Sequence, residues 1–224
     1  MGVVKTLPTH AIVQAVYPRT VTERDEIGMA VGKAIDTALS HMSHELRSSR
    51  RPTLAATNRL AAETLDQELA DADVHLTPEV RTSQLAGVAG VLQAFRRSEV
   101  AGLARPRSRL IVINETVGVY AQPDYWNGRD RFYEMKSYHA TPMPPDVQLQ
   151  VRLFQCAFPG FLGFLACFDR HALPVTTTID PVPALEPGTR EEVLHLAYRT
   201  ALELGAEKVL EYVDNPIVRY SISV

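Results

Sequence analysis

Cysteine is scarce in this sequence, and long apolar segments are missing from it. The two cysteines among 224 residues, Cys156 and Cys167, are too few for a disulfide framework and indicate a reducing compartment. The longest apolar run, residues 158–168, is too short to cross a bilayer, and residues 1–10 lack the apolar segment of a signal peptide. We therefore expect a soluble, cytoplasmic protein with no membrane partner.

The sequence also lacks a net positive charge and the motifs of several enzyme classes. Its formal net charge is −3 at pH 7, so no basic field over the whole protein would attract nucleic acid. No cysteine–histidine cluster has the spacing of a zinc site, and neither G-x-S-x-G nor a Walker-type glycine loop occurs. What is present is a 46% hydrophobic content, enough for one sizeable core, so a single domain is expected.

Local signals predict helices and strands along the chain. Thr22, followed by Asp25, predicts a capped helix that continues to about residue 46, and Thr77-Pro78 predicts the start of a helix that continues to about residue 97. Residues 1–20 are expected to be extended or irregular. The other expected elements are helices over 54–69, from 146 and over 188–204, strands over 110–114, 161–168 and 175–179, and a short strand within 211–224.

Two short β-like runs, 117–122 and 131–138, flank an Asn-Gly pair at 127–128 that strongly favours a hairpin. With a turn of about four residues just past this pair, the register would place Asp124 opposite Glu134, or one residue from it. Cross-strand neighbours lie about 5 Å apart. The sequence therefore predicts two carboxylates held side by side.

Two carboxylates this close repel each other unless a cation lies between them. Mg²⁺ or Mn²⁺ fits, because hard divalent cations bind carboxylates together with phosphate oxygens, and the Met135 carbonyl is a further candidate ligand. Lys136 is expected on the same face of its strand as Glu134, where it would orient a water molecule and offset the charge of a phosphate. This combination indicates metal-dependent hydrolysis of a phosphodiester bond.

The pattern formed by Pro123-Asp124 and Glu134-Met135-Lys136 resembles the PD-(D/E)xK nuclease superfamily, more specifically its RecB-like exonuclease branch. The resemblance covers roughly residues 28–168. It implies an α/β fold with a restriction-endonuclease-like core, in which a mixed central β-sheet is flanked by helices and preceded by an N-terminal helical segment. The single domain 1–224 would then comprise a helical segment over about 22–98, a catalytic sheet core over about 108–180 and a C-terminal helix over about 189–204.

Three more positions fit the motifs of this branch. Glu115 follows a predicted strand where the branch often carries an extra acid. Asp36 stands where a G-x-x-x-H motif has its histidine. Gln150 opens a Q-x-x-x-Y motif in which Phe154 replaces the tyrosine. The resemblance implies Asp124, Glu134, Lys136 and Gln150 as catalytic residues. The metal ligands that it implies are Asp124, Glu134, the Met135 carbonyl, Glu115 and Asp36.

One ridge of the helix predicted from residue 22 carries Gly28, Gly32 and Asp36, each four residues apart. Glycine inside a helix costs up to about 1 kcal/mol, so two on one ridge call for a reason. We expect the close approach of another backbone there, and an Asp36 side chain that reaches a cleft. A simply solvated Asp36 is the alternative.

DNA is the substrate implied by the resemblance, as single strands or at ends, with Tyr138, Arg152 and Tyr125 as nucleic-acid-binding residues. The two tyrosines flank the site and could stack on bases; ordinary packing within the hairpin is the alternative. A homo-oligomer, or a repair or recombination protein, is a possible partner. The two cysteines exclude the four-cysteine iron–sulfur cluster of some relatives.

Two other functions compete with the exonuclease hypothesis. A nuclease-fold module that has lost catalysis and binds nucleic acid or a protein is favoured by the departures from the motifs at Asp36 and Phe154. Retention of Asp124, Glu134 and Lys136 together favours the enzyme. An endonuclease would use the same chemistry, but the sequence contains no separate segment for target recognition.

Overall fold

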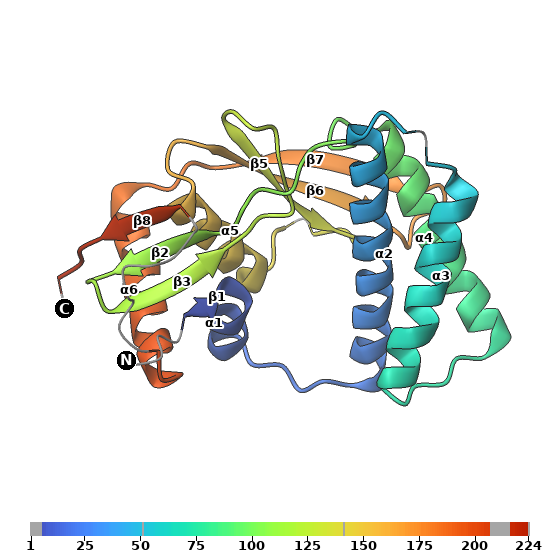
Figure 1. The fold of residues 1–224 in the computed structure, drawn as a ribbon. Helices are drawn as coiled ribbons and strands as arrows, with labels where there is room; N and C mark the ends of the chain where they lie inside the picture. The colour runs from blue at the N-terminus through green and yellow to red at the C-terminus, as the bar shows by residue number, and fades with distance from the viewer. Residues whose placement is uncertain (1–5, 51, 141, 207–215, 224) are drawn as a thin grey trace.

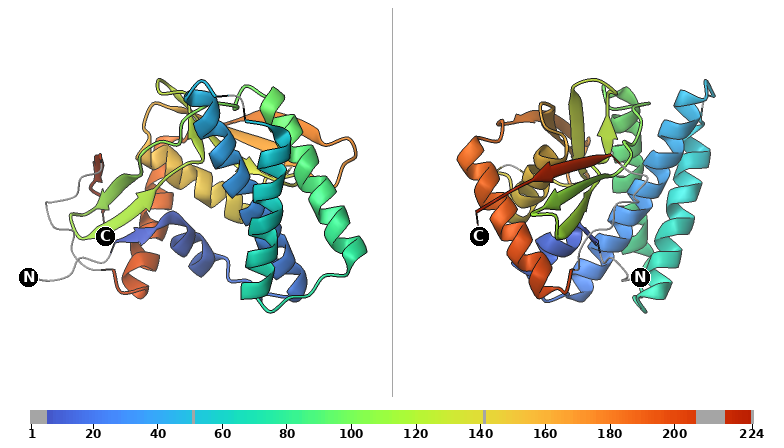
Figure 2. Two further views of the ribbon diagram at one scale, coloured as in Figure 1. Left: turned by 45° about the vertical axis from the view of Figure 1, so that its right-hand side comes forward. Right: turned by 60° about the vertical axis from the view of Figure 1, so that its left-hand side comes forward.

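The computed structural model describes residues 6–50, 52–140, 142–206 and 216–223 of the chain. Four consecutive helices precede most of the strands, and the described strands form two four-stranded mixed sheets with helices packed around them (Figures 1 and 2). The predicted α/β class, a mixed sheet flanked by helices with a helical segment before it, is therefore confirmed. The strands are divided between two sheets, whereas the sequence suggested one.

Three helices form a bundle on one side of the molecule, at the right of Figure 1. The first starts where predicted, because Thr22 and Asp25 make a reciprocal capping box. The third also starts as predicted, with Thr77 as N-cap and Pro78 in the first turn. Their apolar faces bury a common core that includes Phe95 and extends onto one sheet. The helices are α2 (Glu23–Arg47), α3 (Leu54–Asp71) and α4 (Pro78–Arg97).

One sheet lies on the side of the molecule away from this bundle. Its strands are β1 (Leu7–Pro8), β2 (Arg109–Ile113), β3 (Val117–Ala121) and β8 (Ile217–Tyr220), in the order β1-β3-β2-β8. The N-terminal segment expected to be extended or irregular contains the short strand β1 but also helix α1 (Thr9–Val16), because Ile12 is buried in the core of this sheet. The short strand expected within 211–224 is β8; residues 207–215 lie outside the described part.

The second sheet packs against the helical bundle and carries the predicted motif. Its strands are β4 (Tyr125–Trp126), β5 (Arg131–Lys136), β6 (Leu162–Asp169) and β7 (Thr176–Val182), in that order. Strands β5 and β6 are parallel, and helix α5 (Pro145–Ala157) connects them and packs in the core beside the first sheet. Helix α6 (Pro187–Glu203) covers the same core.

The expected hairpin between 117–122 and 131–138 is wrong in its first strand. Strand β3 pairs with β2 over its full length, because Val117–Ala121 is an almost wholly buried apolar run that β2 can cover. The Asn-Gly turn instead joins the short strand β4 to β5. Asn127 stabilises this turn, since its Oδ1 accepts hydrogen bonds from three successive backbone amides, those of residues 129, 130 and 131.

No helix among the described residues has the length and apolar character needed to cross a membrane.

Candidate active site

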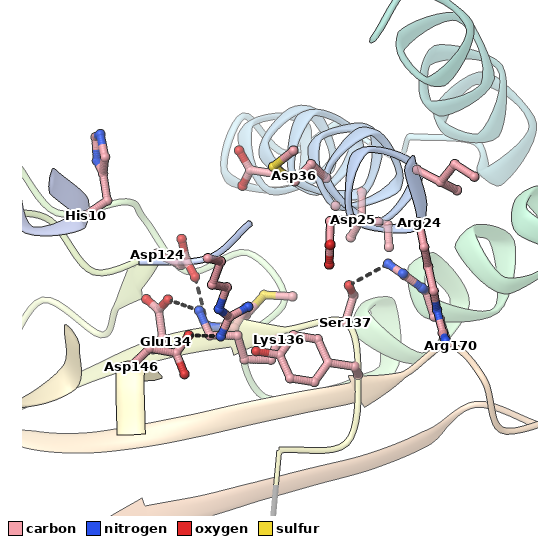
Figure 3. Close-up of a pocket in the computed structure, with 18 of the residues that line it drawn as sticks. His10, Arg24, Asp25, Asp36, Asp124, Glu134, Lys136, Ser137, Asp146 and Arg170 are labelled. Atoms are coloured by element: carbon pink, nitrogen blue, oxygen red, sulfur yellow. Dashed lines mark hydrogen bonds and ion pairs between the residues drawn. The ribbon is translucent and has the colours of Figure 1, made fainter. Parts of the chain in front are cut away.

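A cleft of about 950 Å³ separates α1 and α2 from the end of strand β5 (Figure 3). The side chains that line it come from distant parts of the chain, from His10 on α1 to His171 beyond β6. Asp124, Glu134 and Lys136 lie together in this cleft. The structure therefore brings the two acids and the lysine of the predicted motif to one place.

The position of Asp124 follows from the register of the β4–β5 hairpin. Tyr125 pairs with Tyr133 in antiparallel strands, so the next step along the ladder sets Asp124 opposite Glu134. Asp124 Oδ2 accepts a hydrogen bond of 2.8 Å from the backbone amide of Met135. Burial raises the pKa of Asp124 from 3.8 to about 7, and the negative charge of Glu134 contributes to the same shift.

Glu134 and Lys136 are two residues apart on β5, so their side chains lie on one face of the strand. Lys136 Nζ is 2.7 Å from Glu134 Oε1, and it also donates to Gln150 Oε1 of α5 at 3.3 Å. Burial lowers the pKa of Lys136, but the carboxylates of Glu134 and Asp124 outweigh it, so this pKa lies above its ordinary value. Lys136 is therefore a positively charged hydrogen-bond donor.

The oxygens gathered here suit a hard divalent cation. Asp124 and Glu134 carry more negative charge than Lys136 alone can balance, and a cation would relieve the repulsion that raises the pKa of Asp124. Met135 directs its amide toward Asp124, and its carbonyl lies on the same edge of the strand. Within the described part of the chain, no cluster of three or more acids, histidines or cysteines suits a metal. The protein's own ligands would thus be two carboxylates and a carbonyl, which is enough for Mg²⁺ or Mn²⁺ with water and phosphate oxygens completing the shell.

Asp36 lines the same cleft from α2, as the sequence analysis expected of its side chain. Its carboxylate, however, forms an ion pair with Arg105. Burial raises the pKa of Asp36, Arg105 opposes this effect, and the charge of Asp124 adds to it. Asp36 thus feels the charge of the acidic pair, while its carboxylate is occupied by Arg105.

Glu115 does not reach the site. Strand β2 ends at Ile113, and Glu115 lies in the turn before β3 with a positive φ of 57°. Strand β3 runs from this turn toward Asp124, and its five residues separate the two by about 13 Å of strand. Glu115 is therefore not one of the metal ligands.

Two of the expected nucleic-acid-binding residues are also misplaced. Tyr125 is only 1% exposed and packs against Phe95 in the bundle core, so no base can stack on it. Arg152 lies on the exposed side of α5, where it lines a different, smaller pocket. Tyr138 does line the cleft.

The two glycines of α2 have a different role from the one expected. A Cβ atom added to Gly32 would meet nothing within 4 Å, and one added to Gly28 would meet only the end of Arg170 at 4.0 Å. No backbone approaches them. Both line the cleft, so their missing side chains leave its wall open.

Sequence reasoning missed Arg170 and Ser137, which line the cleft beyond the ends of β6 and β5. The signal available was positional: Arg170 directly follows the apolar strand predicted over 161–168. It also missed Arg19, which lines the cleft and forms an ion pair of 2.6 Å with Asp146 at the start of α5.

No protein-family model matches the chain, and no curated protein matches it. Among solved structures, the chain is similar to the crystal structure of an alkaline exonuclease (LHK-Exo) from Laribacter hongkongensis. The two share 15% sequence identity with a TM-score of 0.34, over 81% of this chain and 92% of that chain. A TM-score this low adds nothing to what the cleft itself indicates.

Proposed function

We propose that this protein is a metal-dependent nuclease that hydrolyses phosphodiester bonds of DNA, and that it acts as a RecB-like exonuclease. The observation that supports the proposal is the meeting of Asp124, Glu134 and Lys136 in one cleft. An acid opposite an acid, with a charged lysine bonded to one of them, is a costly arrangement in a folded protein. It becomes favourable when a cation and an anionic substrate occupy the cleft.

Asp124, Glu134 and the Met135 carbonyl would hold Mg²⁺ or Mn²⁺. When bound, the cation would lower the pKa of water toward neutrality and would stabilise the oxygen that leaves the phosphate. Asp124 would then be ionised, because a cation opposes the effects of burial and of Glu134 on its pKa.

Lys136 would position the reacting groups. A lysine ammonium has three N–H donors, and the bonds to Glu134 and Gln150 use two of them. The third is left for the attacking water or for a phosphate oxygen. Because its pKa is raised, Lys136 orients and stabilises these groups as a charged donor and does not take a proton from the water. Gln150 fixes the direction of the ammonium group.

A single strand or a free end is the form of DNA that fits the cleft. The segment that joins α1 to α2 (Figure 1) lines the cleft with Tyr17, Arg19 and Val21, and Arg19 forms an ion pair with Asp146 of α5. Such a segment restricts a long duplex more than it restricts one strand. Tyr138, in the cleft, could stack on a base.

A nuclease-fold module that has lost catalysis is the second candidate. The ion pair between Asp36 and Arg105 favours it, because that pair occupies the carboxylate that would otherwise be a third acid of the site. Such a module would bind nucleic acid or a protein partner without cutting.

The test uses the purified full chain with end-labelled single- and double-stranded DNA in the presence of Mn²⁺, with EDTA as the metal-free arm. We expect degradation that needs the metal and that falls about 10²- to 10³-fold in Lys136→Ala, since loss of one charged donor at a reacting centre has this effect. Asp124→Asn should abolish it. Arg199→Gln, on the exposed side of α6, is the matched control and should cut normally.

Binding without cleavage in all these proteins would refute the enzyme and favour the module. Products that shorten from one end indicate an exonuclease, and internal fragments would indicate an endonuclease.

A further inference from the structure

Arg170 is a cleft residue to which the proposed chemistry gives no role. It directly follows β6, which runs parallel to β5, so it emerges at the same edge of the sheet as Lys136 and Ser137. Its backbone amide donates to the Ser137 carbonyl at 3.3 Å, and its Nη1 donates to Ser137 Oγ at 3.2 Å (Figure 3). These two bonds fix the guanidinium beside the end of β5.

Two glycines of the helical bundle make room for this side chain. A Cβ atom on Gly87 of α4 would come within 3.1 Å of the Arg170 carbonyl oxygen, so a larger residue there would displace the Arg170 backbone. On α2, a Cβ atom at Gly28 would lie 4.0 Å from Arg170 Nη2, and Gly28 itself lines the cleft. The guanidinium therefore lies at the cleft wall, against the open ridge of α2.

Arg170 forms no ion pair among the described residues, and the charge of the adjacent Asp169 offsets its own only partly, without contact. Two other cations at the cleft have ion-pair partners, since Arg19 pairs with Asp146 and Lys136 pairs with Glu134. Within the described ranges, no carboxylate forms a salt bridge with Arg170, and its buried Nε has no hydrogen-bond partner. The adjacent Asp169 accepts from the amide of His171 instead.

The nearest acid on α2 is also occupied. Asp25, which lines the cleft near Arg170 in Figure 3, accepts hydrogen bonds from the amide and hydroxyl of Thr22 in the capping box. Burial lowers the pKa of Arg170, yet an arginine stays protonated in a protein. A partly buried guanidinium that makes no ion pair is unfavourable, so this position favours a negatively charged ligand that contacts it.

We propose that Arg170, together with the Ser137 hydroxyl, binds a backbone phosphate of a nucleic-acid strand in the cleft, next to the phosphate that is cut. This inference rests on the proposed function. Lys136, Glu134 and Gln150 are joined by hydrogen bonds around the phosphate that would be cut. Arg170 is bonded to Ser137 and is not part of this group, so its ligand would be a neighbouring phosphate of the strand. Arg170 Nη2 has no partner among the described residues, so it can donate to phosphate, and so can the Ser137 hydroxyl proton.

The experiment measures binding separately from cleavage. A fluorescein-labelled single-stranded oligothymidylate is titrated in EDTA with the full-length wild type, Arg170→Gln and Arg170→Lys, by fluorescence anisotropy at several KCl concentrations. Arg199→Gln removes the same charge from exposed α6 and is the matched control. Thermal unfolding checks that each variant is folded. If Arg170→Gln unfolds early, Ser137→Ala replaces it, because this change keeps the arginine and removes only the hydroxyl.

We expect Arg170→Gln to bind about 10- to 100-fold more weakly, as for the loss of a hydrogen bond to a charged group. The slope of log K against log salt should fall in magnitude by about 0.7, the value for one phosphate contact on a single strand. Arg170→Lys should keep this slope and lose part of the affinity, and Ser137→Ala should weaken binding less than Arg170→Gln does.

Unchanged affinity and slope in Arg170→Gln would overturn the inference, as would an equal loss in Arg199→Gln or no binding by the wild type. A wild type that binds the oligonucleotide in EDTA but does not cut it with Mn²⁺ would refute the nuclease proposal and leave the role of Arg170 standing. Cleavage by the wild type together with normal binding by Arg170→Gln would support the nuclease proposal and refute the role of Arg170.

Discussion

Replacing Asp124 by asparagine should make the protein more stable at pH 8, and by less than half as much at pH 5. In the folded protein, burial and the charge of Glu134 raise the pKa of Asp124 from 3.8 to about 7. The folded protein therefore keeps a proton on Asp124 between about pH 4 and pH 7 that the unfolded chain releases. Because the folded state binds more protons in this window, the free energy of unfolding falls as the pH rises.

The size of the effect follows from that difference in pKa. At about 1.4 kcal/mol per pH unit, raising the pKa from 3.8 to about 7 costs the wild type on the order of 4 kcal/mol above pH 7. Asparagine carries no charge and can still accept the hydrogen bond of the Met135 amide through its side-chain oxygen. Lys136 does not disturb the window, since its pKa lies above 10.5. Most of the cost should thus disappear in Asp124→Asn.

Urea unfolding of both proteins in EDTA, at intervals from pH 5 to pH 8, measures this difference. The wild type should lose stability across the interval and Asp124→Asn should not. Mn²⁺ at pH 8 should restore the wild type by about 2.7 kcal/mol when the metal is at 100 times its dissociation constant, and it should do little for the variant. Parallel pH profiles for the two proteins would refute the reasoning, because Asp124 would then ionise at its ordinary pKa.

Two further substitutions test the shape and membership of the site. Gly32→Leu should block cleavage of single-stranded DNA without lowering the unfolding temperature. A Cβ atom there meets nothing within 4 Å, and replacing glycine stabilises a helix by about 1 kcal/mol. A lower unfolding temperature would show that the space is not open. Glu115→Gln should cut DNA at the wild-type rate with the same dependence on Mn²⁺, and a weaker response to the metal would return Glu115 to the site.

Features encoded by neighbouring residues could be predicted from the sequence. The capping box of α2 and the threonine cap and proline start of α4 are local, and they predicted both helix starts correctly. The Asn-Gly turn is local too. It set Asp124 opposite Glu134 even though the expected first strand of the hairpin was wrong, because the register depends only on the turn and the residues beside it.

Features that depend on distant parts of the chain could not be predicted. Strand β3 pairs with β2, and Glu115 lies in the turn that joins them, away from the site. Tyr125 packs against Phe95 in the core of the bundle, and the carboxylate of Asp36 forms an ion pair with Arg105. Arg170 became a cleft residue only because β6 lies parallel to β5 and because glycines of α2 and α4 leave space for it. The residues in these contacts are far apart in the chain, so no local sequence pattern predicts that they meet.

The cleft draws its walls from elements far apart in the sequence, from His10 to His171, and this affects when the site is complete. Newly made protein that has completed α1, α2 and the β4–β5 hairpin still lacks α5, which brings Gln150 to Lys136, and β6, which brings Arg170 to Ser137. An unfinished chain on the ribosome would therefore carry the acidic pair without the groups that align it. The site can therefore be aligned only after about three quarters of the chain, through Arg170, has been made.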